Sequence, residues 1–169
     1  MLTDDGGRAF HIRDMAHTVV DSPIGPLGLI ASDQGLSGVL FHSHGLGAEG
    51  RSPVLAEAAA QLDAYFDGDL VTFDLPLELR GTEFQRRCWL ALASIPYGQT
   101  VSYGEQARRL GLGRDAARAV GAANGQNPLP IVLPCHRVIG ADGSLTGFGG
   151  GLETKRFLLE HEGAILPLG

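Results

Sequence analysis

The chain has 169 residues, with 13 Lys or Arg against 19 Asp or Glu, and 44% of its residues are hydrophobic. This length allows one compact domain or two small ones, and the hydrophobic content is sufficient for a core. No run of residues approaches the ~18 apolar residues of a membrane-spanning helix. The N-terminal segment also lacks the basic and apolar parts of a secretory signal peptide. We therefore expect a cytoplasmic protein with no membrane association.

The charge is unevenly distributed along the chain. Residues 1–80 carry four Arg and twelve Asp or Glu, a balance of −8, whereas residues 84–137 carry seven Arg and two acidic residues, a balance of +5. A basic half within an acidic chain is typical of an anion-binding region, but arginines on solvated helix faces would give the same count. Charge alone leaves these two interpretations open.

The N-terminal half has the pattern of a small α+β unit. Residues 17–41 contain β-branched and apolar runs broken by Pro and Gly, which predicts three strands joined by tight turns. Residues 52–69 predict a helix that Ser52 caps and that has Pro53 in its first turn. Residues 70–79 return to an extended form.

The C-terminal half changes character after a candidate boundary at residues 79–84, so we expect domains over residues 1–79 and 80–169. Its periodicity predicts a helix capped by Thr82, a helix with a capping box from Ser102 to Glu105, two further helices and one extended segment. The predicted helices span residues 82–95, 102–111, 112–128 and 152–163, and the extended segment spans residues 129–134.

Two of these helices, 102–111 and 112–128, are short and are joined by a glycine-containing turn, which is the form of a helix-turn-helix. The first turns of the second helix carry small residues with Arg118 among them, namely Ala116, Ala117, Ala119, Gly121, Ala122 and Ala123. A helix without long polar side chains cannot read base edges, but it can lie deep in a groove. Close packing against neighbouring helices would explain the small residues equally well, although it would not explain Arg118.

Metal and disulfide chemistry have little support. His42 and His44 lie two residues apart and would face the same side of a strand, yet such a pair is more often a solvated strand end than a metal site. The two cysteines, Cys88 and Cys135, have no zinc-type spacing. Cys88 falls on the apolar face of its predicted helix, which indicates a core residue.

The segment PIVLPCHRVIG places Cys135, His136 and Arg137 together after an apolar run. A cysteine acts as a nucleophile through its thiolate, so its pKa of about 8.5 must fall, and a neighbouring imidazole is a common cause. Adjacent residues of an extended segment face opposite sides, so either the backbone turns here or a water connects the two side chains. Glu162, or less favourably Glu160, is the candidate that orients the imidazole. A buried structural cysteine beside a surface histidine is the alternative.

The segment NPLPIVLPCHRVIG resembles the active-site signature of the O6-alkylguanine-DNA alkyltransferases of the bacterial constitutive type. The resemblance covers residues 80–163 almost continuously, through FQRRCWLALASIPYGQTVSYGEQA, AARAVGAANGQNP, DGSLTGFGGG and KRFLLEHEG. It implies an α+β fold class, in which a small N-terminal α+β (ribonuclease-H-like) domain precedes a mainly helical C-terminal domain with a helix-turn-helix.

The resemblance also implies the reaction. The alkyl group on O6 of guanine in double-stranded DNA would move irreversibly to Cys135, once per molecule and with no cofactor or metal. His136 would activate the thiol through a water and would be held by Glu162, while Asn127 would brace the site. Arg137 would be structural, through a carboxylate that ties the two halves together, with a phosphate contact as the alternative.

The same resemblance implies how the target base is reached. The helix-turn-helix would enter the minor groove, Arg118 would replace the base that is flipped out, and Tyr103 would crowd the neighbouring phosphate. Small residues would let the helix approach the sugar-phosphate backbone, and these are Ala116, Ala117 and Gly121. The implied lining of the guanine pocket is Pro130, Val138, Phe148 and Gly149.

Two of these pocket residues depart from the pattern of some relatives, which carry Tyr and Ser there. Phe148 lacks the hydroxyl, and Gly149 lacks the side-chain donor but leaves more room. We therefore hypothesise that larger alkyl groups or O4-methylthymine are accepted. We expect a monomer, and cooperativity on DNA stays open.

Two other functions compete with repair. A recognition module for alkylated DNA would use the same helix-turn-helix, but family relatives of that kind have lost the reactive cysteine, which this chain keeps. A Cys-His hydrolase would need an oxyanion hole, and it would have no use for an Ala/Gly helix that carries arginines. Turnover separates the three, because a hydrolase acts many times, a repair protein once and a recognition module never.

Overall fold

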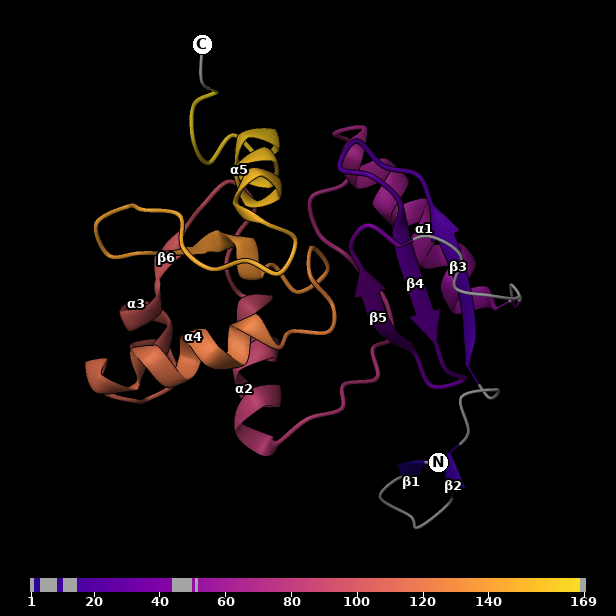
Figure 1. Ribbon diagram of the computed structural model, residues 1–169, viewed down its shortest axis with the longest axis horizontal. Helices are drawn as coiled ribbons and strands as arrows, with labels where there is room; N and C mark the ends of the chain where they lie inside the picture. Colours follow the sequence, from indigo (N-terminus) through magenta and orange to yellow (C-terminus); the bar gives the residue numbers. More distant parts are fainter. Residues whose placement is uncertain (1, 4–8, 11–14, 44–49, 51, 168–169) are drawn as a thin grey trace. The chain divides into compact units, whose positions relative to one another are not determined.

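The structure is a computed structural model that describes residues 2–3, 9–10, 15–43, 50 and 52–167. The chain forms two compact units, Met1–Glu78 and Leu79–Gly169 (Figure 1). None of the helices in the described ranges is long and apolar enough to cross a membrane. The fold class is mixed α+β, as the sequence predicted.

The first unit is built on a three-stranded antiparallel sheet of order β3-β4-β5, and this confirms the three predicted strands. The strands are β3 (Ala16–Val20), β4 (Leu27–Ala31) and β5 (Leu36–Leu40), and a separate pair of short strands is formed by β1 (Leu2–Thr3) and β2 (Ala9–Phe10). The turn from β3 to β4 is closed by a hydrogen bond of 3.0 Å from the Gly25 amide to the Ser22 carbonyl. Gly25 has a φ of +98°, which is costly for residues with a side chain.

Helix α1 (Pro53–Phe66) lies along the sheet and contacts all three strands (Figure 1). It begins where expected, because the Ser52 hydroxyl accepts hydrogen bonds from the amides of Val54 (3.2 Å) and Leu55 (3.3 Å). The core between the helix and the sheet is apolar, and its members include Leu27, Leu29, Leu36, Val39, Leu55, Ala58, Leu62 and Tyr65.

The segment 70–79, for which we predicted an extended form, contains no regular strand or helix. It pairs with the sheet at an isolated parallel bridge between Leu36 and Leu77. Upstream, the side-chain amide of Gln61 donates to the Asp74 carbonyl (2.8 Å) and accepts from the Asp74 amide (2.9 Å). A side chain therefore satisfies backbone groups that a neighbouring strand would otherwise satisfy.

The second unit is mainly helical, and α2 and α3 both contact α4 (Figure 1). Its helices are α2 (Glu83–Leu92), α3 (Tyr103–Arg109), α4 (Ala117–Gly125) and α5 (Leu152–His161). Two short strands, β6 (Val101–Ser102) and β7 (Val138–Ile139), pair in parallel. This pairing brings the first residue of α3 beside the strand that follows Cys135.

The helix caps differ in detail from the prediction. The Ser102 hydroxyl accepts from the Glu105 amide at 3.0 Å, but the Glu105 carboxylate accepts from Arg108 and Arg109 rather than from the Ser102 amide. A complete capping box is present at Thr82 instead, with Gln85 as its partner. The predicted helix 112–128 is also shorter, because a 3₁₀ turn over Arg114–Ala116 precedes α4.

The predicted extended segment 129–134 is instead a compact turn. The Leu133 amide donates to the Leu129 carbonyl at 2.8 Å, and Ile131 has a φ of +74°. The side chains of this turn are buried. A short apolar run has the same pattern in a buried turn as in a buried strand, so the sequence could not separate the two.

Candidate active site

Cys135, His136 and Arg137 form a single 3₁₀ turn, closed by a 3.0 Å hydrogen bond from the Arg137 amide to the Pro134 carbonyl. The backbone therefore turns at this point, which was one of the two options that the sequence left open. All three residues are buried, and Cys135 keeps 9% of its surface exposed. Because the segment is a turn, the three side chains do not alternate between two faces as they would in a strand.

His136 is oriented by Glu162, the residue that follows α5. The imidazole Nε2 lies 2.8 Å from the Glu162 Oε2, and both side chains are fully buried. A carboxylate only accepts hydrogen bonds, so the proton must be on Nε2 and the other ring nitrogen, Nδ1, must be the acceptor. Nδ1 is buried and has no hydrogen-bond partner within the protein. The site thus holds a neutral imidazole with one free basic nitrogen.

The electrostatics of His136 agree with this assignment. Burial lowers the pKa of the imidazole below its ordinary value, because the charged form is poorly solvated there, and this outweighs the opposite effect of Glu162. The ring is therefore neutral at physiological pH and able to accept a proton. Glu160, the weaker candidate for the orienting carboxylate, lies on α5 and lines an outer cavity.

Arg137 binds the same carboxylate. Its Nε donates to the Glu162 Oε1 at 2.8 Å, and its Nη2 donates to Oε2 at 3.0 Å. The remaining nitrogen, Nη1, donates to the Ile95 carbonyl at 2.6 Å, and the guanidinium lies 5.8 Å from the centre of the Tyr97 ring. The carboxylate expected to pair with Arg137 therefore comes from the same unit as the arginine.

Burial raises the pKa of the Cys135 thiol, and the Asn127 side chain and the Lys155 ammonium oppose this effect. Asn127 also braces the turn, because its amide donates to the Leu133 carbonyl (2.8 Å) and its oxygen accepts from the Leu129 amide (2.9 Å). A buried thiol of this kind needs a base nearby to become a thiolate.

Sequence reasoning missed Lys155, which is fully buried on α5. Its ammonium donates to the carbonyls of Val138 (2.7 Å) and Thr146 (2.8 Å), and lies 5.9 Å from the centre of the Tyr103 ring. Burial lowers its pKa to about 8, while Cys135 has the opposite effect. A single lysine in an amphipathic helix normally indicates a solvated side chain, so the sequence held no signal for this position.

Helices α3 and α4 form the predicted helix-turn-helix, and a buried polar contact joins them. The Asn124 amide donates to the Gln106 oxygen at 2.7 Å, and the Gln106 amide returns a hydrogen bond at 3.2 Å. The Trp89 indole of α2 donates to the Ala123 carbonyl at 2.7 Å. These bonds fix α4 between its two neighbours.

The residues that we predicted to contact DNA lie on this helix pair. Arg118 is exposed on α4, and Tyr103 is the first residue of α3. A methyl group added at Gly121 would lie 3.5 Å from the Tyr103 ring, which is an ordinary van der Waals contact, so the packing against Tyr103 does not require a glycine. Of the other two small residues, Ala116 ends the 3₁₀ turn and Ala117 begins α4, and both are partly exposed.

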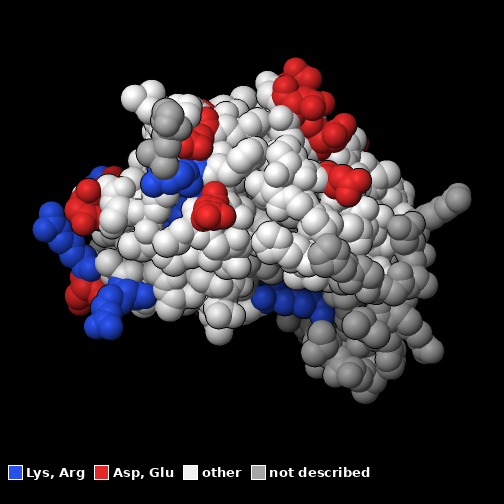
Figure 2. All heavy atoms as spheres, turned by 45° about the horizontal axis from the view of Figure 1, so that its top comes forward, with Lys and Arg blue, Asp and Glu red and all other residues white. Residues whose placement is uncertain are grey.

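A hollow of about 650 Å³ lies beside these residues. Its walls come from the start of α3, the turn before α4 and the loop after β7, and they include Ser102, Tyr103, Arg108, Arg114, Ala117 and Ala141. In the view of Figure 2, Lys and Arg side chains gather at one edge of the molecule with Asp and Glu among them. On α3 the Glu105 carboxylate binds Arg108 and Arg109, and these arginines lower its pKa to about 2.

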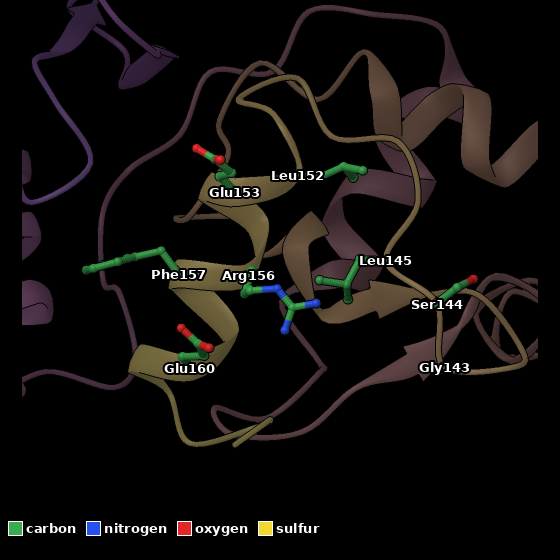
Figure 3. Close-up of a pocket in the computed structure, with 8 residues that line it drawn as sticks. All are labelled: Gly143, Ser144, Leu145, Leu152, Glu153, Arg156, Phe157 and Glu160. Atoms are coloured by element: carbon green, nitrogen blue, oxygen red, sulfur yellow. The ribbon is translucent and has the colours of Figure 1, made fainter. Parts of the chain in front are cut away.

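The loop over residues 140–151 separates β7 from α5 and carries the predicted pocket residues Phe148 and Gly149. Phe148 is partly exposed and Gly149 is exposed, whereas Pro130 and Val138 are buried. A cavity of about 520 Å³ lies between this loop and α5, and Figure 3 shows Arg156 extending from the helix toward Leu145 of the loop. None of Cys135, His136 and Glu162 lines that cavity.

Metal ligands are not gathered at this site. Within the described ranges there is no group of three or more His, Cys, Asp and Glu side chains that could hold a metal ion. The alternative metal pair included His44, which lies outside the described residues.

Both units match families of known proteins. Residues 15–79 match the family model for the ribonuclease-like domain of 6-O-methylguanine DNA methyltransferase, and residues 83–164 match the model for its DNA binding domain. The methylated-DNA–protein-cysteine methyltransferase of Mycolicibacterium paratuberculosis is 52% identical over 151 residues, which cover 86% of this chain and 91% of that protein. The protein of the same name from Methanosarcina acetivorans is 46% identical over 156 residues, covering 89% and 99%.

A solved structure shows the same architecture. The crystal structure of Mycobacterium tuberculosis OGT in complex with DNA is 49% identical, with a TM-score of 0.80, and the match covers 88% of this chain and 92% of that one. A ribonuclease-like unit followed by a helix-turn-helix unit defines a class of DNA-binding methyltransferases. The chain belongs to the 6-O-methylguanine DNA methyltransferase family.

Proposed function

We propose that this protein repairs double-stranded DNA by moving the alkyl group from O6 of guanine to the sulfur of Cys135. Relatives named methylated-DNA–protein-cysteine methyltransferase, about 50% identical over most of the chain, support this activity. The observation that carries the assignment to Cys135 is the turn that it shares with His136. The free Nδ1 of that imidazole is the base that a buried thiol requires.

The reaction balances without a cofactor. Cys135 gives its proton to His136 Nδ1 through a bridging water, and the thiolate attacks the alkyl carbon. A sulfur–carbon bond forms as the carbon–oxygen bond breaks, and the electron pair of that bond passes to guanine O6. Guanine then takes up one proton at N1, so the proton lost by the thiol equals the proton gained by the base. Because the thioether is stable, each molecule acts once.

Asn127 and Lys155 complete the machinery of this step. Both lower the pKa of Cys135 against the effect of burial, and both hold backbone carbonyls of the surrounding turns. Their donors therefore favour the thiolate without exposing it to bulk water. A thiolate in a dry site reacts with the alkyl carbon rather than with solvent protons.

The DNA-binding part of the proposal rests on α3 and α4. An atom inside a duplex cannot reach a buried cysteine, so the target base must be flipped out of the stack. Arg118 is exposed on α4 and is suited to fill the vacated space, and Tyr103, the first residue of α3, would crowd a phosphate. Ala116, Ala117 and Gly121 keep the surface of the helix low, so that groove shape and phosphate contacts give affinity without sequence preference.

The first experiment measures the stoichiometry of transfer. The protein is mixed with excess duplex that carries one O6-methylguanine, and intact mass is measured for the wild type and for Cys135→Ser. We expect one added methyl group on the wild type and none on the variant. An unmodified protein that still binds the duplex tightly would be a recognition module, and continuing product release with unchanged protein mass would indicate a hydrolase.

Base flipping has its own test. Arg118→Ala should slow transfer from a duplex but not from free O6-benzylguanine, because the free base needs no extrusion from a stack. The expected loss on duplex is about tenfold or more, since extrusion costs a few kcal/mol. Equal loss on both substrates would show that Arg118 acts on the chemistry rather than on the flipping.

The substrate range follows from the loop. Phe148 has no hydroxyl, and a side chain added at Gly149 would meet nothing within 4 Å, so this wall of the pocket is open. Larger O6-alkyl groups and O4-methylthymine are therefore included in the proposal. Comparing rates on methylguanine, benzylguanine and methylthymine duplexes tests this, and reaction with methylguanine alone would refute it.

The remaining expectations are part of the same proposal. We infer a cytoplasmic monomer with a ribonuclease-like domain over residues 1–79 and an alkyltransferase domain over residues 80–169. Sedimentation of the protein with and without a duplex measures both the monomeric state and any cooperativity on DNA.

A further inference from the structure

The orienting carboxylate of the site is shared between two cationic or potentially cationic side chains. Glu162 Oε2 lies 2.8 Å from His136 Nε2 and 3.0 Å from Arg137 Nη2, and Oε1 lies 2.8 Å from Arg137 Nε. The Arg137 contact is therefore a bidentate ion pair, the strongest geometry for this pair of groups. The carboxylate that orients His136 is therefore also bound by Arg137.

The protonation state of Glu162 decides which imidazole nitrogen is free. An ionised carboxylate only accepts, so it places the imidazole proton on Nε2 and leaves Nδ1 as the base. A protonated carboxyl would donate to Nε2 and move the ring proton to Nδ1, which would then have no lone pair to accept a proton from the thiol. A buried carboxyl without a cationic partner tends toward the protonated form. Arg137 removes that tendency.

The charge of Arg137 also acts on the imidazole itself. If Glu162 instead stayed ionised without the arginine, it would favour a positive His136, because a lone buried anion stabilises the imidazolium next to it. Arg137 balances the carboxylate and, together with Lys155, opposes protonation of the ring. The groups that act on His136 are thus Glu162 after α5, Arg137 in the same 3₁₀ turn and Lys155 on α5.

Arg137 is itself fixed from the other side. Its Nη1 donates to the carbonyl of Ile95 at 2.6 Å, in the turn that follows α2, and its guanidinium lies 5.8 Å from the centre of the Tyr97 ring. The side chain is 7% exposed. Because the turn that follows α2 holds one edge of the guanidinium, the other edge is presented to Glu162 in one orientation.

We propose that Arg137 is a positioning residue of the alkyl-transfer reaction, which keeps Glu162 a charge-balanced acceptor and thereby holds His136 as the neutral imidazole with Nδ1 free. The inference rests on the proposed function for its role in transfer, but the state of the imidazole does not depend on it. Two readouts therefore test it, one without DNA and one with it.

The first readout is the imidazole state by nitrogen NMR on protein labelled at its six histidines. His136→Gln assigns the signal of His136. The wild type should show a neutral ring with its proton on Nε2 near pH 7. In Arg137→Met the ring should become imidazolium or carry its proton on Nδ1, and in Arg137→Lys, which keeps the charge, it should return to the wild-type form.

The second readout is the rate constant of a single turnover on an O6-methylguanine duplex between about pH 5.5 and 9. The acid limb of this profile reports the base of the free protein. In Arg137→Met we expect a slower reaction whose acid limb moves up by about one pH unit or more, the usual effect of one nearby charge. Arg137→Lys should restore the limb while remaining slower, because lysine cannot bind both carboxylate oxygens in a fork.

Arg87→Met is the matched control, since it removes the same charge from an exposed arginine of α2 that donates only to the Leu110 carbonyl in the described contacts. At saturating DNA, Arg87→Met should leave both the acid limb of the rate profile and the protonation state of His136 unchanged.

The proposal would be overturned if His136 kept its proton on Nε2 in Arg137→Met while the rate of transfer fell equally at every pH. So would a failure of Arg137→Met and Arg137→Gln to fold, because Arg137 would then serve stability alone. If the wild type transfers no alkyl group while the imidazole state still follows Arg137, the proposed function fails and the positioning role stands.

Discussion

The two units of the molecule bury different kinds of side chain. Among the described residues of the first unit, the buried polar side chains are uncharged: Ser32, Ser43 and Gln61. The second unit buries an arginine, a lysine and a glutamate together with a histidine, within one contact network between the 3₁₀ turn and α5. Because the two units are similar in size, the difference in buried charge does not arise from a difference in the size of their cores.

The physical cost of the second arrangement shows what it is for. A buried ion pair often contributes no more to stability than apolar side chains of the same volume, because desolvation offsets the attraction. Shifted pKa values at His136, Cys135 and Lys155 occur in this one network. Charges retained at that cost are typical of a reactive site, whereas the apolar core of the first unit serves stability.

The largest effect is expected from Glu162→Gln. The amide leaves Arg137 without its counter-charge and no longer fixes the imidazole tautomer, so transfer should slow by about 10²- to 10⁴-fold, the usual contribution of a positioned base. Single-turnover rates at saturating duplex measure this. Glu160→Gln is the matched control on the same turn of the chain, and it should change the rate less than about twofold because Glu160 lies at the outer cavity. Equal losses in both variants would contradict the assignment of Glu162.

The apolar unit should respond in the opposite way to Leu29→Ala. Leu29 is fully buried between the sheet and α1, so its truncation should lower the free energy of unfolding by about 2–5 kcal/mol. The rate of transfer by the folded protein should not change, because no described hydrogen bond of His136 or Arg137 comes from the first unit. Urea unfolding and single-turnover rates measure the two effects.

Val71→Ala is the control for that experiment, since Val71 is 53% exposed and its loss should cost less than about 0.5 kcal/mol. A change in the pH profile of transfer in Leu29→Ala would show that the first unit also affects the protonation of the active site. That result would contradict the assignment of stability to the first unit and reactivity to the second.

The sequence predicted the regular elements better than the connections between them. The three strands and the helix that follows Ser52 were correct, because alternation and helix caps are local signals. The turn at 129–134 was missed, because an apolar run does not reveal whether the chain is straight or folded back. The capping box was assigned to Ser102 because the residue types fit, yet Glu105 found arginines instead.

The site was predicted to a similar degree. The contact between His136 and Glu162 was expected from residue types and from the family resemblance, and the structure shows it. The buried position of Lys155 was not expected, and neither was Glu162 as the carboxylate that binds Arg137, since both depend on which carbonyls and carboxylates surround a long side chain after folding. The separation of 25 residues between Arg137 and Glu162 leaves no local pattern that would reveal the pair.

The smallest expected effect concerns the only lysine of the chain, Lys155. Its pKa is about 8 in the folded protein against about 10.4 for an unfolded chain. Below pH 8 both states hold the proton. Between about pH 8 and 10.4 the unfolded state binds more protons, so this group raises the free energy of unfolding as pH increases, by on the order of 3 kcal/mol in total. Lys155→Met should lose that rise.

Urea unfolding at pH 7.5 and pH 10 measures the difference between the two proteins. Arg156→Met, on the next position of α5, is the matched control, because it removes a charge from the same helix but keeps Lys155, so the rise with pH should persist. The single ammonium signal of nitrogen-labelled lysine gives the pKa directly. Parallel stability curves for the wild type and Lys155→Met would show that the buried ammonium is not destabilised by the fold. The desolvation cost of the buried charges in the second unit would then be smaller than the comparison with the first unit implies.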